Sequence, residues 1–335
     1  MTLPASSSAD SRTRAPQPRE LDRRAGARRI AERTIAAGSK SFALASRVLP
    51  PQKRLDAWLL YSWCRHADDV IDRQCPEARP EALATLRDQV ESFYDDRPLS
   101  NPLWDALREV LERRRIPKEY LSTLLDGMQM DVERHAYRTT DELLLYCHRV
   151  AGVVGLMMVQ ILGIDRRSAL RAAAQLGLAM QLTNIARDVL EDWNDGRLYL
   201  PDEWLNDAGI GDLRARLGEP FPAAATSGVA AVVERMLILA DQFYRTSDTG
   251  LVALDPRSAL AVRTARAVYS EIGQQVRARR CDVTRGRAVV STARKIALLG
   301  KAVALASLEL PRRLALPRVE LPVERLPRFP EDVLP

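Results

Sequence analysis

The sequence predicts an all-α protein, and three observations lead to this prediction. Long segments without proline carry apolar residues three and four positions apart, which is the spacing of one face of a helix. Ala, Leu, Arg and Glu dominate a chain in which only 16 of 335 residues are glycine. Runs of β-branched residues are rare. With 46% hydrophobic and 28% charged residues, the chain has the composition of a soluble globular protein.

The two ends of the chain give little helical signal. Residues 1–20 are rich in Ser, Pro and Arg, lack periodicity and contain no apolar core of a signal peptide, so a disordered tail is expected there. Repeated prolines from Leu310 onward rule out a continued helix. The prediction is therefore one folded domain over residues 21–309, followed by a Pro-rich tail over 310–335.

Proline-free periodic segments place the helices of this domain. A first helix is expected over residues 21–37, ending at Gly38, after which Ser39 can cap a second one. Further helices are expected over 52–73, 81–94, 102–114, 118–134, 139–163, 166–193, 228–247, 256–280 and 287–308. Gly152 and Gly155 fall inside a helix, where each costs up to ~1 kcal/mol relative to Ala, so their presence needs a reason such as close helix packing.

Two of the predicted helices carry an acidic ladder beside an apolar stripe. The first ladder comprises Tyr61, Arg65, Asp68 and Asp72, and the second comprises Gln181, Asn184, Asp188 and Asp192. Facing carboxylates of this kind could bind Mg²⁺ together with a diphosphate, because Mg²⁺ takes oxygen ligands from a few carboxylates and from phosphates. Arg65 and Arg187 suit bidentate contact with phosphate. The alternative is a solvated, salt-bridged face, but two such stretches in one chain favour a metal site.

These stretches resemble known motifs. Asp68-Asp-Val-Ile-Asp72 and Asn184-Ile-Ala-Arg-Asp-Val-Leu-Glu-Asp192 resemble the paired aspartate-rich motifs of the squalene/phytoene synthases. Ser39–Phe42, Tyr146–Gly155 and Arg197–Pro201 match further family segments in the same order. The resemblance covers roughly residues 35–300 and is greatest to the bacterial phytoene synthases. It implies a single-domain isoprenoid-synthase-type helical bundle with a central cavity, in which Gly152 and Gly155 could leave room for an isoprenoid chain.

The resemblance also implies a reaction. This is the Mg²⁺-dependent head-to-head condensation of two geranylgeranyl diphosphates, through prephytoene diphosphate, to phytoene. The implied metal ligands, for Mg²⁺ or alternatively Mn²⁺, are Asp68, Asp72, Asn184, Asp188 and Asp192. The implied catalytic residues are Asp68, Asp72, Asp188, Asp192, Tyr61 and Arg65, and the implied substrate-binding residues are Ser39, Lys40, Ser41, Phe42, Gln181, Arg187 and Tyr269. No NADPH is expected, because phytoene forms by proton loss.

Three segments leave their roles open. Gly286 stands where the family commonly has an arginine, so Arg285 or Arg287 is the expected substitute for a diphosphate contact. Asp126 and Asp131 lie five residues apart and do not share a helical stripe, so no metal role is expected for them. The segment Arg197–Pro201 is expected to begin a lid over the cavity.

Competing functions remain open. A squalene-type or presqualene-type synthase acting on farnesyl diphosphate would carry the same motifs, because the depth of the pocket cannot be read from the sequence. A prenyl elongase would share Asp68-Asp-x-x-Asp72, but the ladder from Asn184 to Asp192 argues against it. A non-catalytic helical assembly factor would be expected to lose ladder carboxylates, and this chain keeps them.

The charge pattern bears on partners and location. The net charge is +6, with arginines clustered over residues 12–33 and from Arg312 onward. No aromatic interleaving or nucleic-acid motif accompanies them, so no nucleic-acid partner is expected and an anionic membrane surface is the better prediction. The alternative, which the composition favours, is a basic tail that is simply solvated. Four scattered cysteines without metal-ligand spacing indicate reduced thiols. The apolar stretch Val150–Ile164 falls short of the ~20 residues of a membrane span. We expect a cytoplasmic protein that associates peripherally with membranes.

Overall fold

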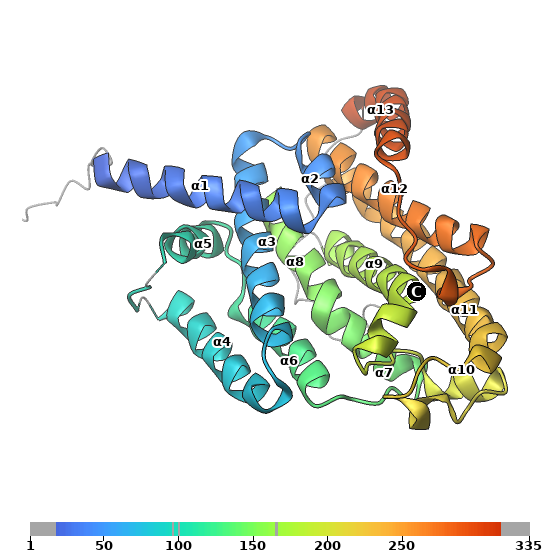
Figure 1. The fold of residues 1–335 in the computed structure, drawn as a ribbon. Coiled ribbons are helices and arrows are strands. Elements are labelled where there is room, and N and C mark those ends of the chain that lie inside the picture. Colours follow the sequence, from blue (N-terminus) through green and yellow to red (C-terminus); the bar gives the residue numbers. More distant parts are fainter. Residues whose placement is uncertain (1–17, 96, 100, 165–166, 316–335) are drawn as a thin grey trace, which may run out of the picture.

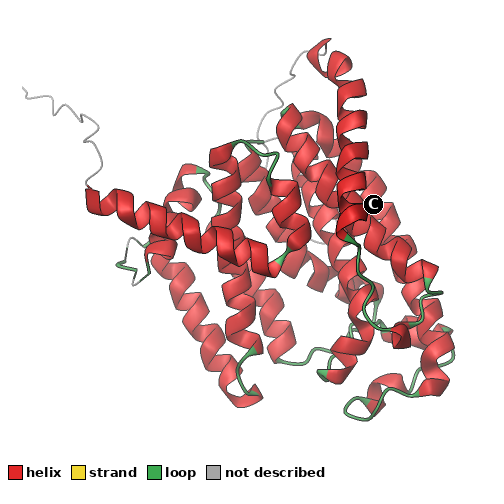
Figure 2. Ribbon diagram, turned by 45° about the horizontal axis from the view of Figure 1, so that its top comes forward, coloured by secondary structure: helices red, strands yellow, loops and turns green. Residues whose placement is uncertain are grey.

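The computed structural model describes residues 18–315 apart from 96, 100 and 165–166 (Figure 1). All regular structure within this part of the chain is helical (Figure 2), which confirms the predicted all-α class. Residues 1–17 of the expected N-terminal tail and residues 316–335 of the expected C-terminal tail lie outside the described residues.

Most helices lie within a few residues of their predicted bounds. Those that build the fold are α1 (Pro18–Gly38), α2 (Lys40–Ser46), α3 (Pro51–Asp72), α4 (Arg79–Tyr94), α5 (Pro102–Arg113), α6 (Lys118–Val132), α7 (Thr140–Cys147), α8 (Val153–Leu162), α9 (Arg167–Asn194), α10 (Asp202–Asp207), α11 (Thr226–Ser247), α12 (Pro256–Ala278) and α13 (Thr292–Ala315). The last helix begins five residues later than predicted and continues past Pro311. A proline removes one backbone donor and can kink a helix without ending it.

Helix α9 is the centre of one half of the bundle, and α3 is the centre of the other (Figure 1). Helices α8, α11 and α12 pack around α9, where Leu178 and Leu182 are fully buried. Helices α1, α4, α5 and α8 pack against α3, where Trp63 and Ala67 are fully buried. Each of the two helices with an acidic ladder therefore has its apolar stripe in the core, as the periodicity predicts.

Helix α1 is part of this core. Ala27, Ala31 and Ile35 recur every four residues and are 0–2% exposed, and they belong to the face that packs on α3 and α5. The basic segment expected to reach a membrane thus has a structural role over its second half. Its arginines at positions 28, 29 and 33 lie on the opposite, exposed face.

The single helix predicted over residues 139–163 is divided. A π-helical turn, η2 (His148–Gly152), separates α7 from α8, and the Val153 amide donates to the carbonyl of His148, five residues earlier. Close packing explains the glycines on either side of the α8–α9 contact. A Cβ on Gly155 would lie 2.2 Å from the Ala173 carbonyl oxygen, and one on Gly177 would lie 2.3 Å from the Ala151 carbonyl oxygen. The backbones of the two helices can approach this closely only because these positions lack side chains.

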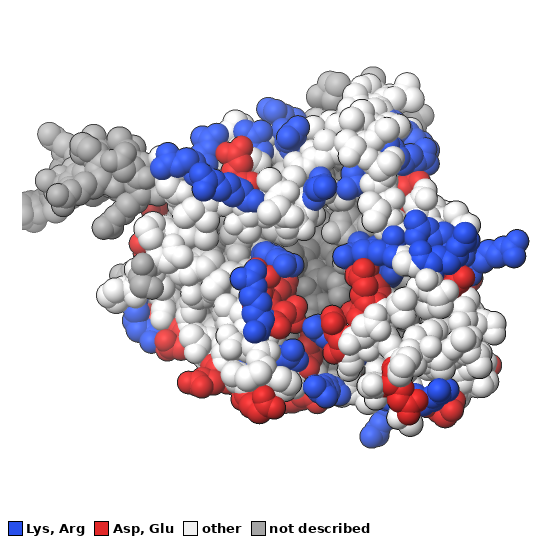
Figure 3. Space-filling model, viewed as in Figure 1, with Lys and Arg blue, Asp and Glu red and all other residues white. Residues whose placement is uncertain are grey.

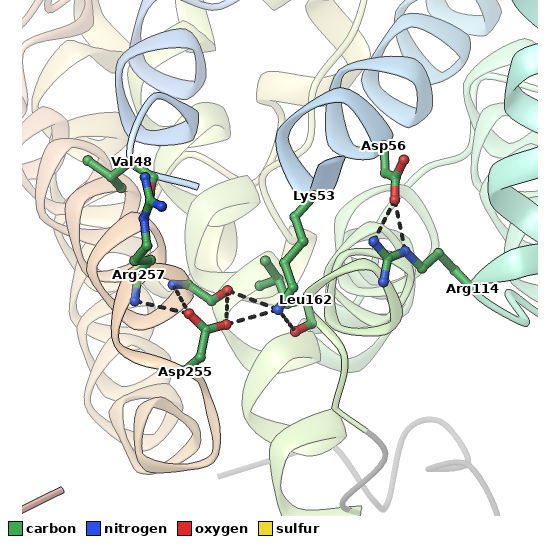
Figure 4. Close-up of polar contacts among 8 residues, drawn as sticks. Val48, Lys53, Asp56, Arg114, Leu162, Asp255 and Arg257 are labelled. Carbon is green, nitrogen blue, oxygen red and sulfur yellow. Dashed lines mark hydrogen bonds and ion pairs between the residues drawn. The ribbon is translucent and has the colours of Figure 1, made fainter. Parts of the chain in front are cut away.

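An ion pair joins three helix ends far from the acidic ladders (Figure 4). Lys53 Nζ of α3 donates to the Leu162 carbonyl oxygen at the end of α8, at 2.6 Å, and contacts Asp255 Oδ2 at 2.9 Å. Asp255 in turn accepts hydrogen bonds from the backbone amides of Arg257 and Ser258 and so caps α12. Nearby, the fully buried Asp56 pairs with Arg114 (Figure 4) and with Arg113.

Two stretches of the described chain have the length and composition of a membrane span, Thr140–Leu162 and Ala223–Ala253. The first stretch contains most of the apolar segment Val150–Ile164 and reaches this length only together with α7 and the π-helical turn. In the first stretch, 56% of the apolar window is buried inside the protein, and in the second, 39%. The first also packs on α9, as a core helix of a bundle does.

Candidate active site

A cavity of about 720 Å³ lies between the two halves of the bundle. One end is polar and the other is apolar. Most of the predicted site residues line it: Ser39, Lys40, Ser41, Phe42, Tyr61, Arg65, Asp68, Gln181, Asn184, Arg187 and Tyr269. The other three, Asp72, Asp188 and Asp192, are not among its lining residues. They lie one or two helical turns further along their helices, and Figure 3 shows acidic and basic side chains on both sides of a central hollow.

The apolar end of the cavity extends to the Lys53 ion pair. Leu162, Ile164 and Leu254 line it there, next to the chain ends that Lys53 joins. Gly155 and Gly177 are also lining residues, so the positions that allow close helix packing leave space beside the backbone as well. The cavity can accept a long apolar chain with a charged group at its polar end.

The first acidic ladder is rich in unbalanced negative charge. Asp68 is exposed to the cavity, but protein surrounds that cavity, and desolvation together with the carboxylate of Asp72 raises the pKa of Asp68 to about 7. The guanidinium of Arg65 opposes this rise. It lies 2.8 Å from Asp69, outside the ladder.

Two arginines hold the second ladder. Arg187 contacts both carboxylate oxygens of Asp188, at 2.7 and 2.5 Å, and Arg287 contacts the same two oxygens at 3.0 and 3.1 Å. One turn further on, burial and then the charge of Asp188 raise the pKa of Asp192 to about 7. In this ladder the charge of Asp188 is therefore neutralised by two arginines, whereas the surroundings of Asp192 favour its protonated form.

Of the two arginines proposed for the diphosphate contact, Arg287 lies at the cavity and Arg285 does not. Gly286 between them has a φ of 73°, a conformation that glycine adopts at little cost. The chain turns at this glycine, and the next residue, Arg287, contacts Asp188 and lines the cavity. Arg285 is exposed and is not a lining residue.

Arg197 connects the two ladders. Its backbone amide donates to the Asp192 carbonyl oxygen at 2.7 Å, and its guanidinium lies 3.0 Å from Asp72. The expected lid is not observed, because the residues that follow are packed inside the protein. Leu198, Tyr199 and Leu200 are 0–7% exposed, and Arg214 donates to two of their carbonyl oxygens.

Asp131 is a site residue that the sequence reasoning missed. It accepts hydrogen bonds from the hydroxyls of Tyr199, at 2.7 Å, and Tyr146, at 3.0 Å. Burial raises the pKa of Asp131 to about 6, and its charge in turn raises the pKa values of Asp68 and Asp192 on both ladders. Asp126, five residues earlier, instead pairs with Arg87, so the two aspartates differ in their surroundings. The available signal was that Tyr146 and Tyr199 lie in two of the matching motifs.

Aromatic side chains form one wall near the polar end. The rings of Phe42 and Tyr61 lie 5.7 Å apart, and a Cβ on Gly38 would lie 2.3 Å from the Tyr61 hydroxyl oxygen. Burial raises the pKa of Tyr61 to about 12, so its hydroxyl stays protonated. Ser39 Oγ accepts a hydrogen bond from the Phe42 amide at 3.2 Å. This confirms the expected N-cap and engages the Ser39 side chain in helix capping.

The donor set of the ladders fits a hard divalent cation that arrives with a diphosphate. Within the described residues, no three His, Cys, Asp or Glu side chains already form a metal-binding group. Mg²⁺, however, is commonly bound by one or two carboxylates together with substrate phosphates and water. The pKa values of Asp68 and Asp192 are raised first by burial and then by neighbouring carboxylates, and a bound cation would neutralise that negative charge.

Comparisons with known proteins agree with this geometry. Residues 35–294 match the family model described as squalene/phytoene synthase. A 15-cis-phytoene synthase from Paracoccus sp. is 42% identical over 274 residues, which is 79% of this chain and 87% of that protein. A phytoene synthase from Pseudescherichia vulneris is 40% identical and covers 80% of this chain and 88% of its own length.

Solved structures show the same fold. The crystal structure of a dehydrosqualene synthase in complex with a ligand superposes with a TM-score of 0.77 at 29% identity, over 86% of this chain and 99% of that one. The structure of a squalene synthase from Alicyclobacillus acidocaldarius gives a TM-score of 0.68 over 78% of this chain and 96% of that one. At 23% identity, the second likeness concerns the fold alone.

Proposed function

The chain belongs to the squalene/phytoene synthase family, and from this membership we propose that it condenses two geranylgeranyl diphosphates head to head to give phytoene. The observation that carries the proposal is that relatives named phytoene synthase are 38–42% identical over 78–81% of this chain. The cavity supports it, because its polar end suits a diphosphate and its apolar end suits a prenyl chain. The proposed intermediate is prephytoene diphosphate.

Residues at the polar end would bind and orient the diphosphate. Arg65, Arg187 and Lys40 supply positive charge, and Ser41 supplies a hydroxyl donor, all at the cavity lining. Arg287 adds a third guanidinium beside Asp188. Since Asp188 already pairs with two arginines, binding of a diphosphate would let those arginines exchange one anionic partner for another.

The ladders would hold the metal. The proposed ligands of Mg²⁺, or of Mn²⁺ in its place, are Asp68, Asp72, Asn184, Asp188 and Asp192. The bound metal supplies Lewis-acid stabilisation of the leaving diphosphate. Tyr61, Phe42 and Tyr269 line the cavity, where their ring faces could stabilise an allylic cation, and the apolar walls would exclude the water that would trap it. Gln181 lies beside Asn184 and orients its amide. Proton loss completes phytoene, so no NADPH is required.

Product analysis tests the substrate. Purified protein with Mg²⁺ should convert C20 geranylgeranyl diphosphate to a C40 hydrocarbon and leave C15 farnesyl diphosphate largely unused. The likeness to a dehydrosqualene synthase structure makes farnesyl diphosphate the second candidate. A C30 product formed faster than the C40 product would replace our proposal with this one.

The location follows from the product. A C40 hydrocarbon partitions overwhelmingly into lipid, at roughly 0.8 kcal/mol per CH₂, so we place the protein in the cytoplasm in reversible contact with an anionic membrane. Arg28, Arg29 and Arg33 on the exposed face of α1 could each add about 1 kcal/mol of attraction. Replacing these three by Gln should weaken vesicle binding at low salt while the buried face of α1 stays intact. Unchanged binding would remove this role.

A further inference from the structure

Helix α13 and the segment that precedes it leave large apolar side chains exposed. The exposed fractions are 68% for Val289, 58% for Ile296, 42% for Val303 and 76% for Leu308. Ile296, the half-buried Leu299 and Val303 follow one another at spacings of three and four, so they form one stripe along the helix. Ala302 is the one buried residue between Thr292 and Leu308. A contiguous apolar stripe of this kind commonly marks an interaction site.

The same region is strongly basic. Residues 283–308 contain five cations and no carboxylate, the cations being Arg285, Arg287, Arg294, Lys295 and Lys301. Arg287 and Arg294 pair with acids of α9 and α12, whereas Lys295 lies close enough to Lys40 for the two charges to repel. A helix that merely faces solvent typically alternates the two signs of charge. The arrangement of cations beside an apolar stripe fits an anionic, apolar partner.

The segment that precedes α13 reaches the cavity. Val289, Val290 and Lys295 are among the residues that line the cavity, and Val289 is also exposed on the outside. Figure 3 shows the surface over α13 as largely uncharged, with basic side chains between it and the central hollow. Val289 thus belongs both to the cavity lining and to the exposed apolar surface that precedes α13.

We propose that the α13 surface, made of Val289, Ile296, Leu299, Val303 and Lys301, lies on an anionic lipid bilayer. The apolar stripe enters the interface, and the cations contact lipid phosphates. Given the proposed function, on which this role rests, the product leaves the cavity along Val289 directly into lipid. A second copy of the chain is a poorer occupant. A two-fold interface would bring the patch against itself and place the cations of both copies together.

Flotation with lipid vesicles tests the surface on the full-length protein. The vesicles contain phosphatidylcholine with or without phosphatidylglycerol, at low salt and at about 1 M salt. The double variant Ile296→Ser/Val303→Ser should bind anionic vesicles at least about tenfold more weakly than the unaltered protein, because two aliphatic side chains that enter the bilayer are lost. Lys301→Gln should reduce binding about fivefold to anionic vesicles and leave binding to neutral vesicles unchanged. The matched control is Ile238→Ser/Val252→Ser, which alters exposed aliphatic residues of α11 and of the 3₁₀ turn η5 (Asp248–Ala253) and should bind normally.

Three outcomes overturn the proposal. One is equal vesicle binding by the double variant and the control, and another is binding that appears only after residues 316–335 are removed, which would make the tail the occupant. The third is a dimer of the unaltered protein that the double variant abolishes. Turnover of detergent-dispersed substrate separates this proposal from the proposed function. Normal vesicle binding without phytoene formation would overturn the proposed function but support the membrane role of the α13 surface. Phytoene formation without vesicle binding would support the function and overturn the membrane role.

Discussion

Arg197 Nη2 lies 3.0 Å from Asp72 Oδ1, across 125 positions of sequence. Asp72 ends α3, whereas Arg197 follows α9 and its amide is bonded to the carbonyl of Asp192. This ion pair therefore joins the ends of the two acidic ladders. Asp131 adds a carboxylate between them, hydrogen-bonded to Tyr146 and Tyr199. The candidate site is one electrostatic unit, in which each charge alters the protonation of the others.

Replacing Arg197 by Met should remove the ion pair that joins the two acidic ladders. Loss of a partly buried cation beside three carboxylates should lower the free energy of unfolding of the metal-free protein by about 2 kcal/mol at pH 8, as measured by urea denaturation in EDTA. Arg73→Met is the matched control, because Arg73 makes a largely exposed pair with Asp69 on α3 and should cost less than about 1 kcal/mol. Equal losses in the two variants would show that Arg197 has no special role.

Asp188→Asn should reduce turnover by at least about a thousandfold, since Asp188 is a proposed metal ligand held by two arginines. Because Asp188 also contacts Arg187 and Arg287, the substitution should lower the free energy of unfolding by about 1–2 kcal/mol. Circular dichroism should show a folded variant, and wild-type turnover in that folded variant would exclude Asp188 as a ligand.

Asp192→Asn should stabilise the metal-free protein while abolishing turnover. The folded-state pKa of Asp192 is raised to about 7 from 3.8, so its ionisation destabilises the fold increasingly as pH rises through this window. The variant should exceed the wild type by about 1 kcal/mol at pH 8, after allowance for solvent screening. The difference should shrink toward pH 4 and also on addition of Mg²⁺. A variant less stable than the wild type at pH 8 in EDTA would contradict the charge argument.

Lys53→Met, at the apolar end of the cavity, should lower the free energy of unfolding by an amount that depends on pH. Burial alone would raise the pKa of Asp255, but hydrogen bonds from Ser258 and Lys53 hold it at about 2. The stabilisation is therefore complete above the unfolded pKa of about 4 and is lost as pH falls toward 2. Partial exposure of Asp255 limits it to about 1 kcal/mol. Urea midpoints of the two proteins should differ at pH 7 and converge near pH 2, and a constant gap would point to lost packing alone.

Gly155→Ala should destabilise the protein by more than about 2 kcal/mol, because the added Cβ meets a backbone oxygen of α9 at 2.2 Å and must push the two helices apart. Gly300→Ala on α13 is the matched control. No atom lies within 4 Å of its added Cβ, so it should gain up to about 1 kcal/mol from helix propensity. Melting temperatures should therefore move in opposite directions.

The helices, the two ladders and the family could all be predicted from the sequence. Each depends on local information: a helical period places Asp68 near Asp72 and Asn184 near Asp188, and the motifs that carry the resemblance are contiguous. The prediction that Ser39 caps α2 needed only the residues beside it. The roles assigned to the ladder residues remain predictions.

The tertiary structure decided what depends on contacts between distant segments. No helical period could place Asp131 among the ladders, because its partners Tyr146 and Tyr199 come from two other segments. The lid prediction was wrong because Arg214, fifteen residues later, binds the carbonyls of the segment after Arg197 and holds it inside the protein. Likewise, Arg287 rather than Arg285 meets Asp188 because of the backbone turn at Gly286. The sequence shows the chemistry of each side chain and the helical period that it follows. Which side chains of distant segments contact one another depends on how the helices pack.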